Sequence, residues 1–222
     1  MLRVALTGGV GSGKSAAAAM LHQMGAYVAS SDDVGRAWMQ PGQPAYVAIV
    51  EHFGKGVVAA DGLLDRAALA RIAFNEGRVD ELNAIVHPLV IAQQAAWAKQ
   101  IAARDPYAVT VVESALVFET KYAATTEDAS PWRVRFDRIV VVVAPLALRR
   151  QRYIARLTAQ DEASAGADFD RRCAAQWSDE QKAALADFVV ENDGSLDDLR
   201  TKMETVWKQL KAESAKNASE IL

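Results

Sequence analysis

Apolar and polar positions along this chain separate into two kinds of segment. Most of its β-rich runs are continuously apolar rather than alternating, which is typical of strands covered on both faces of a sheet. The expected strands are Leu2–Thr7, Tyr27–Ser31, Ala108–Ser114, Arg138–Ala144 and Asp187–Glu191. Because segments with helical spacing lie between these runs, the pattern predicts an α/β fold with a parallel, right-handed, doubly wound sheet.

Helical spacing recurs in six segments between and after the strands. The expected helices are Lys14–Met24, Pro44–Phe53, Arg66–Phe74, Pro88–Ala103, Leu146–Leu157 and Leu196–Lys211. Local signals at helix ends support two of these assignments. Gly25 lies just past the first helix, where a left-handed residue ends a helix well, and Ser195 with Asp198 has the spacing of a capping box.

Several regions fall outside this alternation of strands and helices. No convincing strand lies between Asp33 and Arg104, and a connection this long predicts a helical subdomain. We expect a polar surface loop over Lys121–Arg135 and a flexible hairpin tip between helices over Thr158–Asp168. The last dozen residues, 211–222, are expected to fray.

The overall composition narrows the class of protein. The chain has 222 residues, of which 51% are hydrophobic and 24% charged, as in an ordinary globular domain. It carries 25 Lys and Arg against 28 Asp and Glu, a net charge of -3, which argues against a broad nucleic-acid surface. The apolar runs are far shorter than the roughly 20 residues that span a bilayer, and the first residues lead straight into a strand. We therefore expect a cytoplasmic protein with no nucleic-acid or membrane partner.

The metal-binding and redox side chains are few. Cys173 is the only cysteine, which excludes an internal disulfide and favours a buried, reduced thiol over a nucleophile. The histidines are His22, His52 and His87, and their separation fits no metal-ligand spacing.

A phosphate-binding motif gives the strongest indication of chemistry. Gly8–Ser15 reads GGVGSGKS and fits the pattern G-x-x-x-x-G-K-[ST] between an expected strand and an expected helix. The loop's backbone N–H groups and the helix N-terminus bind phosphates, Lys14 adds a charge, and Ser15 offers an oxygen to Mg²⁺. The sequence thus predicts ATP binding with Mg²⁺. The expected nucleotide contacts are Gly9, Val10, Gly11, Ser12, Gly13, Lys14, Ser15 and Ala16.

Two carboxylates follow strands of the expected sheet. Ligands gather at the carboxyl edge of such sheets, so Asp32, after the second strand, is the candidate general base for an acceptor hydroxyl. The alternative is that Asp32 or Asp33 caps the next helix. Glu113, after the third strand, is placed to bind a Mg²⁺-bound water, with helix capping or a solvent contact as the alternative. The Asn-Lys-x-Asp segment of guanine-specific G proteins is missing, which argues against a G protein of that type. A kinase needs an acceptor site with its own base close to the loop, and Asp32 is the candidate for that base.

Arginines on one expected helix form a second candidate cluster. Arg152 and Arg156 are one turn apart and can face the same ligand. Charged residues on a helix commonly form its solvated face. Opposite a phosphate loop, however, a mobile lid that supplies arginines to the transferring phosphoryl group is a common device.

The chain resembles the dephospho-coenzyme A kinases, the last enzymes of coenzyme A synthesis. Its opening, VALTGGVGSGKSAAAAMLHQMGAYVASSDDVGR, is similar to theirs, and the similarity extends from about residue 2 to 210. A phosphate loop alone is generic. The order DGLLDRAAL (Asp61–Leu69), His87-Pro88-Leu89 and ALVFE (Ala115–Glu119) is specific.

The resemblance implies a P-loop kinase fold, similar to nucleoside monophosphate kinases, with a five-stranded parallel sheet wrapped by helices. The implied parts are a core (about 1–32, 105–145 and 187–210), a helical acceptor-binding insertion (about 33–104) and a lid (about 146–186). The implied reaction transfers the ATP γ-phosphate to the ribose 3′-hydroxyl of dephospho-coenzyme A.

The family also implies roles for single residues. Asp32 matches the proposed base, and Arg152 with Arg156 matches the lid. The acceptor-side positions are Arg66, His87 and Pro88; helix opening for His87, and capping or an ion pair for Arg66, are the structural alternatives. We expect a monomer or weak homo-oligomer.

The chain departs from the family pattern in places. Ser30-Ser31-Asp32 replaces the usual Asp-x-Asp, Ala115 stands in place of a proline, and the loop after Glu119 is longer. Two other functions stay open. One is a P-loop kinase for another nucleoside or nucleotide acceptor, and the other is a non-catalytic binding module controlled by nucleotide.

Overall fold

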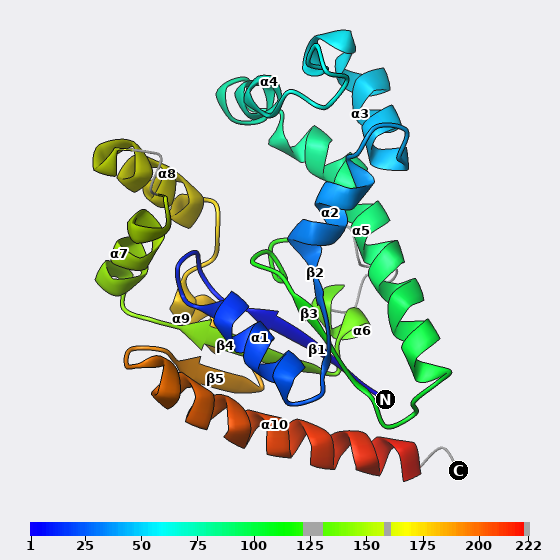
Figure 1. Cartoon of the computed structure of the whole chain (residues 1–222), viewed down its shortest axis with the longest axis vertical. Coiled ribbons are helices and arrows are strands. Elements are labelled where there is room, and N and C mark those ends of the chain that lie inside the picture. Colours follow the sequence, from blue (N-terminus) through cyan, green and yellow to red (C-terminus); the bar gives the residue numbers. More distant parts are fainter. Residues whose placement is uncertain (122–130, 158–160, 220–222) are drawn as a thin grey trace. The chain divides into compact units, whose positions relative to one another are not determined.

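The computed structural model describes residues 1–121, 131–157 and 161–219 (Figure 1). The chain divides into two compact units. Residues 30–97 form one unit, and the described residues on both sides of this segment form the other. We refer to them as the helical unit and the sheet unit.

A five-stranded sheet with the order β2-β3-β1-β4-β5 confirms the expected α/β fold. Its strands are β1 (Leu2–Thr7), β2 (Tyr27–Ser30), β3 (Val109–Glu113), β4 (Arg138–Val143) and β5 (Phe188–Glu191). β1 pairs in parallel with both β3 and β4, and β4 pairs in parallel with β5. All five strands were expected to within one residue at each end. The extra residue at the end of the second strand, Ser31, is the first residue of a helix.

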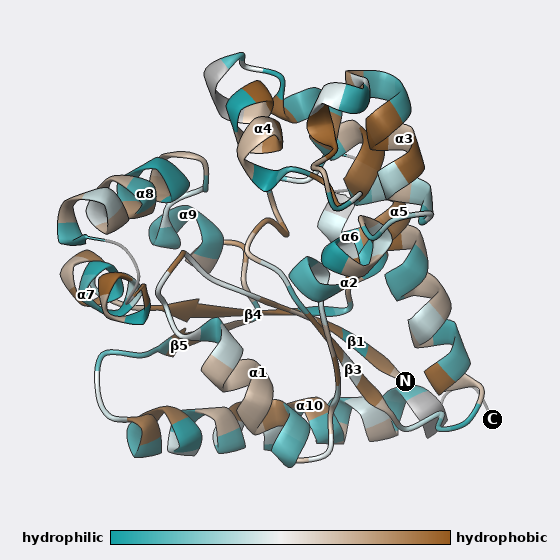
Figure 2. Cartoon of the chain, turned by 45° about the horizontal axis from the view of Figure 1, so that its top comes forward, coloured by the Kyte–Doolittle hydropathy of each residue, from teal (hydrophilic) through white to brown (hydrophobic). Residues whose placement is uncertain are grey.

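Apolar side chains cover both faces of the sheet, as the continuous runs predicted. The central strands β1, β3 and β4 are mostly brown in Figure 2, whereas α10 (Leu196–Ser219) alternates between hydrophobic and hydrophilic residues. One face packs against α1 (Lys14–Gln23) and α10 through a cluster that includes Val4, Leu6, Leu21, Val111, Val140, Leu199 and Met203. On the same strands, Ala5, Val112, Ile139 and Val141 are buried as well. Burial on both faces is typical of a parallel sheet, because the helices of the crossover connections cover both sides.

Helix ends in the sheet unit follow the expected local signals. Gly25 has a φ of 104° just after α1, a conformation that glycine adopts without strain. At the start of α10, the Ser195 N–H donates to Asp198 Oδ2 at 2.9 Å and the Asp198 N–H donates to Ser195 Oγ at 3.2 Å. The expected capping box is thus confirmed.

The expectation of a frayed end from residue 211 is wrong as far as Ser219, where α10 ends. Ser214 is fully buried, and its hydroxyl donates to the carbonyls of Tyr107 and Ala108 at 2.9 and 3.1 Å. Glu213 forms an ion pair with Arg138 at 2.7 Å. These long-range contacts keep a polar segment helical, although its composition predicted that it would fray. Residues 220–222 lie outside the described structure.

Among its described residues, the sheet unit contains four further helices. They are α6 (Pro131–Arg135), α7 (Leu146–Arg156), α8 (Glu162–Ala174) and α9 (Asp179–Ala183). The expected hairpin tip over Thr158–Asp168 is wrong from residue 161 onward. Asp161 caps α8 by accepting the Ser164 N–H at 2.9 Å, and Phe169 is buried against Tyr153. Residues 158–160 lie outside the described structure.

The polar segment Lys121–Arg135 ends in a helix. Residues 122–130, most of the expected loop, lie outside the described structure, and α6 follows them. Trp132 in α6 lies edge-on to the rings of Phe118 and Trp177, at centroid distances of 5.2 and 6.1 Å. Such aromatic contacts hold α6 against the segments that contain Phe118 and Trp177.

The helical unit packs around its own core. Its elements are α2 (Ser31–Trp38), α3 (Pro44–Phe53), η1 (Lys55–Val57), α4 (Arg66–Ala70), η2 (Arg71–Asn75) and α5 (Val79–Ala102), the last of which continues beyond residue 97. Ile49, Val57 and Leu69 form the buried centre of this core. The helix expected over Arg66–Phe74 is α-helical only to Ala70 and then turns into the π-helical η2.

The expectation that a helix opens at Pro88 is also wrong. α5 begins nine residues earlier, at Val79, and Pro88 lies inside it. A proline in a helix removes the hydrogen bond to the carbonyl four residues earlier. That carbonyl belongs to Ala84, which is exposed, so water can satisfy it and the helix can continue.

Among the helices that the structure describes, none combines the length and apolarity needed to cross a bilayer.

We predict that deleting residues 213–222 lowers the free energy of unfolding by roughly 1–3 kcal/mol, because the buried Ser214 hydrogen bonds and the Glu213 ion pair are lost. Urea denaturation of the full and shortened chains measures this difference. Ser214→Ala, which removes only the two hydrogen bonds, should give a smaller loss. An unchanged denaturation midpoint in the shortened chain would contradict a docked C-terminal helix.

Candidate active site

The phosphate loop connects the buried strand β1 to helix α1. Gly11 and Gly13 have φ angles of 77° and 94°, which glycine tolerates and other residues rarely adopt. Within the described residues, α1 has no side-chain cap at its N-terminus, and its first turn contains no acidic residue. The first N–H groups of α1 are thus left for a ligand, and the helix dipole favours an anion there.

The two residues predicted to organise a metal ion lie together. Ser15 Oγ donates a hydrogen bond to Glu113 Oε1 at 2.6 Å. The strand register explains the approach, because Leu6 of β1 lies beside Glu113 at the end of β3. A hydroxyl and a carboxylate next to a phosphate loop are the oxygen ligands that Mg²⁺ prefers, so this pair fits the ion.

Asn192 joins the phosphate loop to α7. Its side-chain amide donates to the carbonyl of Ser12 at 2.8 Å, and its own carbonyl accepts from Arg152 Nη1 at 2.9 Å. Arg152 is therefore held close to the loop, where the sequence predicted a lid arginine. Asn192 lies within the region of family resemblance, about residues 2 to 210, but sequence analysis assigned it no role.

Arg156 lies one turn further along α7 and is exposed. Its guanidinium lies 5.7 Å from the centre of the Tyr153 ring. The Tyr153 hydroxyl donates to Asp168 of α8, and Arg172 forms an ion pair with the same carboxylate at 2.8 Å. Burial opposes ionisation of Asp168, but these hydrogen bonds outweigh it and lower its pKa. The network attaches α8 to the face of α7 next to Arg156.

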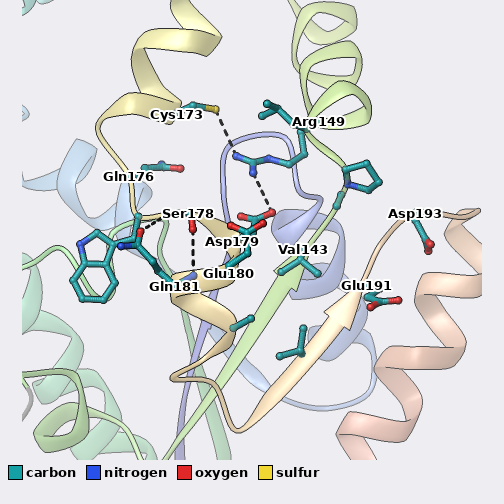
Figure 3. A pocket seen from close by; sticks show the side chains of 16 residues that line it. Val143, Arg149, Cys173, Gln176, Ser178, Asp179, Glu180, Gln181, Glu191 and Asp193 are labelled. Carbon is teal, nitrogen blue, oxygen red and sulfur yellow. Dashed lines mark hydrogen bonds and ion pairs between the residues drawn. The ribbon is translucent and has the colours of Figure 1, made fainter.

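A pocket of about 860 Å³ opens at the carboxyl ends of β4 and β5 (Figure 3). Its walls combine apolar side chains (Val143, Leu146, Val189) with acidic ones (Asp179, Glu180, Glu191, Asp193). Two other lining residues contact the phosphate loop directly. Gln176 Oε1 accepts the Val10 N–H at 3.1 Å, and Arg149 Nε donates to the Val10 carbonyl at 2.9 Å. The pocket is thus in contact with the nucleotide-binding loop.

The single cysteine also lines this pocket. Burial raises the pKa of the Cys173 thiol, against a smaller opposing effect of Arg149. A raised pKa disfavours the thiolate that a nucleophile needs. Cys173 is half-buried and not fully buried as expected, but its raised pKa favours the thiol over a nucleophilic thiolate.

Lys182 and the ALVFE segment form a buried ion pair. Lys182 is fully buried, lies 3.0 Å from Glu119 Oε1 and donates to the Ala115 carbonyl at 2.9 Å. The same carboxylate oxygen accepts the Trp177 N–H at 2.8 Å. Ala115 and Glu119 belong to the specific ALVFE segment, and these contacts join that segment, which follows β3, to α9.

In the helical unit, Asp32 is the second residue of α2 and is exposed. The alternative that Asp32 or Asp33 caps α2 is wrong, because the cap is Ser30, whose hydroxyl accepts the Asp33 N–H at 3.3 Å. Asp33 instead pairs with Arg36 at 2.5 Å, and this hydrogen bond lowers the pKa of Asp33. The carboxylate of Asp32 is not used for capping, and its role as a base stays a prediction.

The DGLLDR motif forms a turn followed by a helix cap. Asp61 accepts the Leu63 N–H at 3.0 Å, and the Gly62 carbonyl accepts the Tyr46 hydroxyl at 2.8 Å. Asp65 caps α4 by accepting the N–H groups of Ala67 and Ala68, so capping by Arg66 is wrong.

The three expected acceptor-side residues belong to two helices of the helical unit. Arg66 is exposed in the first turn of α4. His87 is half-buried and Pro88 exposed, both in the interior of α5. His87 therefore does not open a helix. Acceptor binding by these three residues stays a prediction.

Comparison with known proteins identifies the family. The family model described as dephospho-CoA kinase matches residues 2–198. The chain belongs to the dephospho-CoA kinase family. The dephospho-CoA kinase of Frankia casuarinae is 39% identical over 96% of this chain and 85% of that protein. The enzyme of Leifsonia xyli is 34% identical over 95% of this chain and its own full length. The resemblance stated from the sequence is confirmed.

Solved structures support the fold. TT1252 from Thermus thermophilus has a TM-score of 0.68 and 29% identity, and the match covers 94% of this chain and 97% of that one. The dephospho-CoA kinase from Campylobacter jejuni has a TM-score of 0.55 over 94% of this chain and 96% of that one. At 20% identity, the second match supports the fold alone.

We predict that Lys182→Met lowers the free energy of unfolding by roughly 3–5 kcal/mol, because it leaves the Glu119 carboxylate enclosed without its counter-charge. Chemical denaturation of purified protein measures this loss. The double variant Lys182→Met/Glu119→Gln removes the uncompensated charge and should recover part of the stability. A single variant as stable as the wild type would show that the ion pair is dispensable.

Proposed function

We propose that this chain transfers the γ-phosphoryl group of ATP to the ribose 3′-hydroxyl of dephospho-coenzyme A, giving coenzyme A and ADP. The observation that carries the proposal is the uncapped N-terminus of α1 behind a glycine-rich loop, with Ser15 and Glu113 in contact beside it. Family membership supplies the acceptor. We propose a cytoplasmic enzyme that acts as a monomer or weak homo-oligomer, without nucleic-acid or membrane partners.

The phosphate loop binds the donor. The proposed contacts are backbone and side-chain groups of residues 9–16, with the charge of Lys14 directed at the β- and γ-phosphates. Ser15 and Glu113 would hold Mg²⁺, which when bound neutralises charge on the phosphates.

Asp32 serves as the general base in this proposal. Its carboxylate accepts the proton of the 3′-hydroxyl as the oxygen attacks phosphorus. The first family aspartate is replaced by Ser30, whose hydroxyl caps α2, and the next residue, Ser31, accepts a hydrogen bond from Gln94 at 2.9 Å. Both serines thus have structural partners, so the proposed chemistry relies on Asp32 alone. Arg66, His87 and Pro88 are the proposed acceptor contacts.

Arg152 and Arg156 neutralise the charge that spreads over the transferring phosphoryl oxygens. Support comes from the contact of Arg152 with Asn192, which itself binds the phosphate loop. Arg156 is exposed and therefore accessible to a ligand.

The two alternative functions are not favoured. Relatives that align along nearly the whole chain are dephospho-CoA kinases, which argues against a different acceptor. A non-catalytic nucleotide switch needs no general base, yet the capping of α2 by Ser30 leaves Asp32 available for catalysis.

We predict that the purified protein converts dephospho-coenzyme A to coenzyme A in the presence of Mg·ATP, as identified by mass spectrometry. Lys14→Ala and Asp32→Asn should each lower turnover by roughly a hundredfold or more. Lys14→Ala removes the positive charge that binds the phosphates, and Asp32→Asn removes the general base. Asp32→Asn should still bind ATP. If the wild type binds ATP but forms no coenzyme A, the proposed acceptor is wrong.

We predict that Glu113→Gln raises the Mg²⁺ concentration for half-maximal activity by roughly tenfold, because a carboxylate next to Ser15 loses its charge. A titration of turnover against Mg²⁺ at fixed ATP measures the change. Glu162→Gln, which neutralises an exposed acid in the first turn of α8, is the control and should leave the titration unchanged. Equal Mg²⁺ dependence in Glu113→Gln and the wild type would exclude Glu113 from the metal site.

A further inference from the structure

Arg149 is buried against the phosphate loop, unlike the arginines that follow it on α7. Its side chain is only 9% exposed. Nε donates to the Val10 carbonyl at 2.9 Å, Nη1 forms an ion pair with Asp179 at 3.0 Å, and Nη2 lies 3.5 Å from Cys173 Sγ. Figure 3 shows the guanidinium between α8 and α9, with dashed lines to Cys173 and Asp179. One side chain of α7 thus contacts the phosphate loop, α8 and α9.

Two glycines of the phosphate loop leave the space that Arg149 occupies. A Cβ atom on Gly9 would lie 2.1 Å from Arg149 Nη2 and 2.4 Å from its Cζ. A Cβ on Gly11 would lie 2.3 Å from the Arg149 carbonyl oxygen. Both distances are far below van der Waals contact, so α7 can approach the loop only because these two residues lack side chains. Gly9 and Gly11 therefore accommodate a protein partner as well as a ligand.

The backbone around Val10 is held on both sides. Its carbonyl accepts from Arg149, while its N–H donates to Gln176, which lies in the segment between α8 and α9. Both bonds come from residues within the expected lid region, so the phosphate loop is tied directly to α7 and to the segment between α8 and α9.

All three nitrogens of the Arg149 guanidinium contact protein groups. Each of its three nitrogens is directed at the loop, α9 or α8, and its charge is balanced by the enclosed Asp179 carboxylate. Arg152 and Arg156, by contrast, are half-buried and exposed. This arrangement suits a group that fixes the loop and does not suit one that moves onto a phosphoryl group.

We propose that Arg149 and Asp179 form a positioning pair that fixes the backbone of residues 9–11 in the shape that receives the donor phosphates. The pair acts through the loop and does not touch the nucleotide. The inference rests on the proposed function only in that the phosphate loop binds a nucleotide.

The decisive variants are Arg149→Met, Arg149→Lys and Asp179→Asn, and the matched control is Arg150→Met. Arg150 is the next residue on α7, 43% exposed, and 3.9 Å from Asp170. Each purified full-length variant is titrated with ADP by calorimetry, assayed for kcat and for KM of ATP and dephospho-coenzyme A, and heated to obtain Tm.

Arg149→Met should raise the dissociation constant for ADP and the KM for ATP by roughly tenfold or more, with the KM for dephospho-coenzyme A changed by less than about twofold. Asp179→Asn should shift the same two quantities in the same direction. Arg149→Lys should fall between Arg149→Met and the wild type, since an ammonium cannot reproduce the planar fork of bonds. Arg150→Met should match the wild type in all of them.

Two results would overturn the proposal. A lowered Tm with unchanged ADP affinity would reduce Arg149 to a stabilising residue. A lowered kcat with unchanged ADP affinity and KM for ATP would make it a group that acts in the transition state. If Arg149→Met does not fold, Arg149→Lys and Asp179→Asn decide between the same outcomes. Failure of the wild type to bind ADP would contradict the proposed function instead.

Discussion

The site in the sheet unit depends on the parallel pairing of β1 with β3 on one side and β4 on the other. Parallel strands bring their carboxyl ends to one edge, so the chain that leaves β1 has Glu113 beside it on β3 and the end of β4 opposite. A Cβ on Gly8 would lie 2.2 Å from the Val142 carbonyl, which shows how closely the loop follows that edge. The contact of the loop with Glu113 depends on the pairing of β1 with β3. Its contacts with Arg149 and Asn192, which follow β4 and β5, depend on the neighbouring parallel strands on the other side.

Sequence reasoning succeeded where a local pattern decides the structure. Buried strands require continuous apolar runs, so β1 and β4 could be located directly. The phosphate loop follows from a motif, and Glu113 from its position at a strand end. Each of these features is encoded in a short stretch of sequence, and the groups that it contacts lie at the carboxyl edge of the sheet.

Errors arose where distant residues decide a local conformation. α8 and the end of α10 are polar in composition, but a cap at Asp161 and the burial of Ser214 hold them in helices. Pro88 normally marks a helix start, yet solvent at Ala84 allows α5 to pass through it. The ion pair between Lys182 and Glu119 is a further case, because a sequence carries no sign that these two distant residues will enclose each other's charge.

The contacts around Val10 have a thermodynamic consequence for ligand recognition. Ordering a segment rich in glycine costs more chain entropy than ordering any other, because glycine has the widest choice of backbone conformations. Arg149, Gln176 and Asn192 fasten this segment through Val10 and Ser12. The entropy is thus lost when the protein folds rather than when a nucleotide arrives. A loop preorganised in this way can direct nearly all of the energy of its phosphate contacts into affinity.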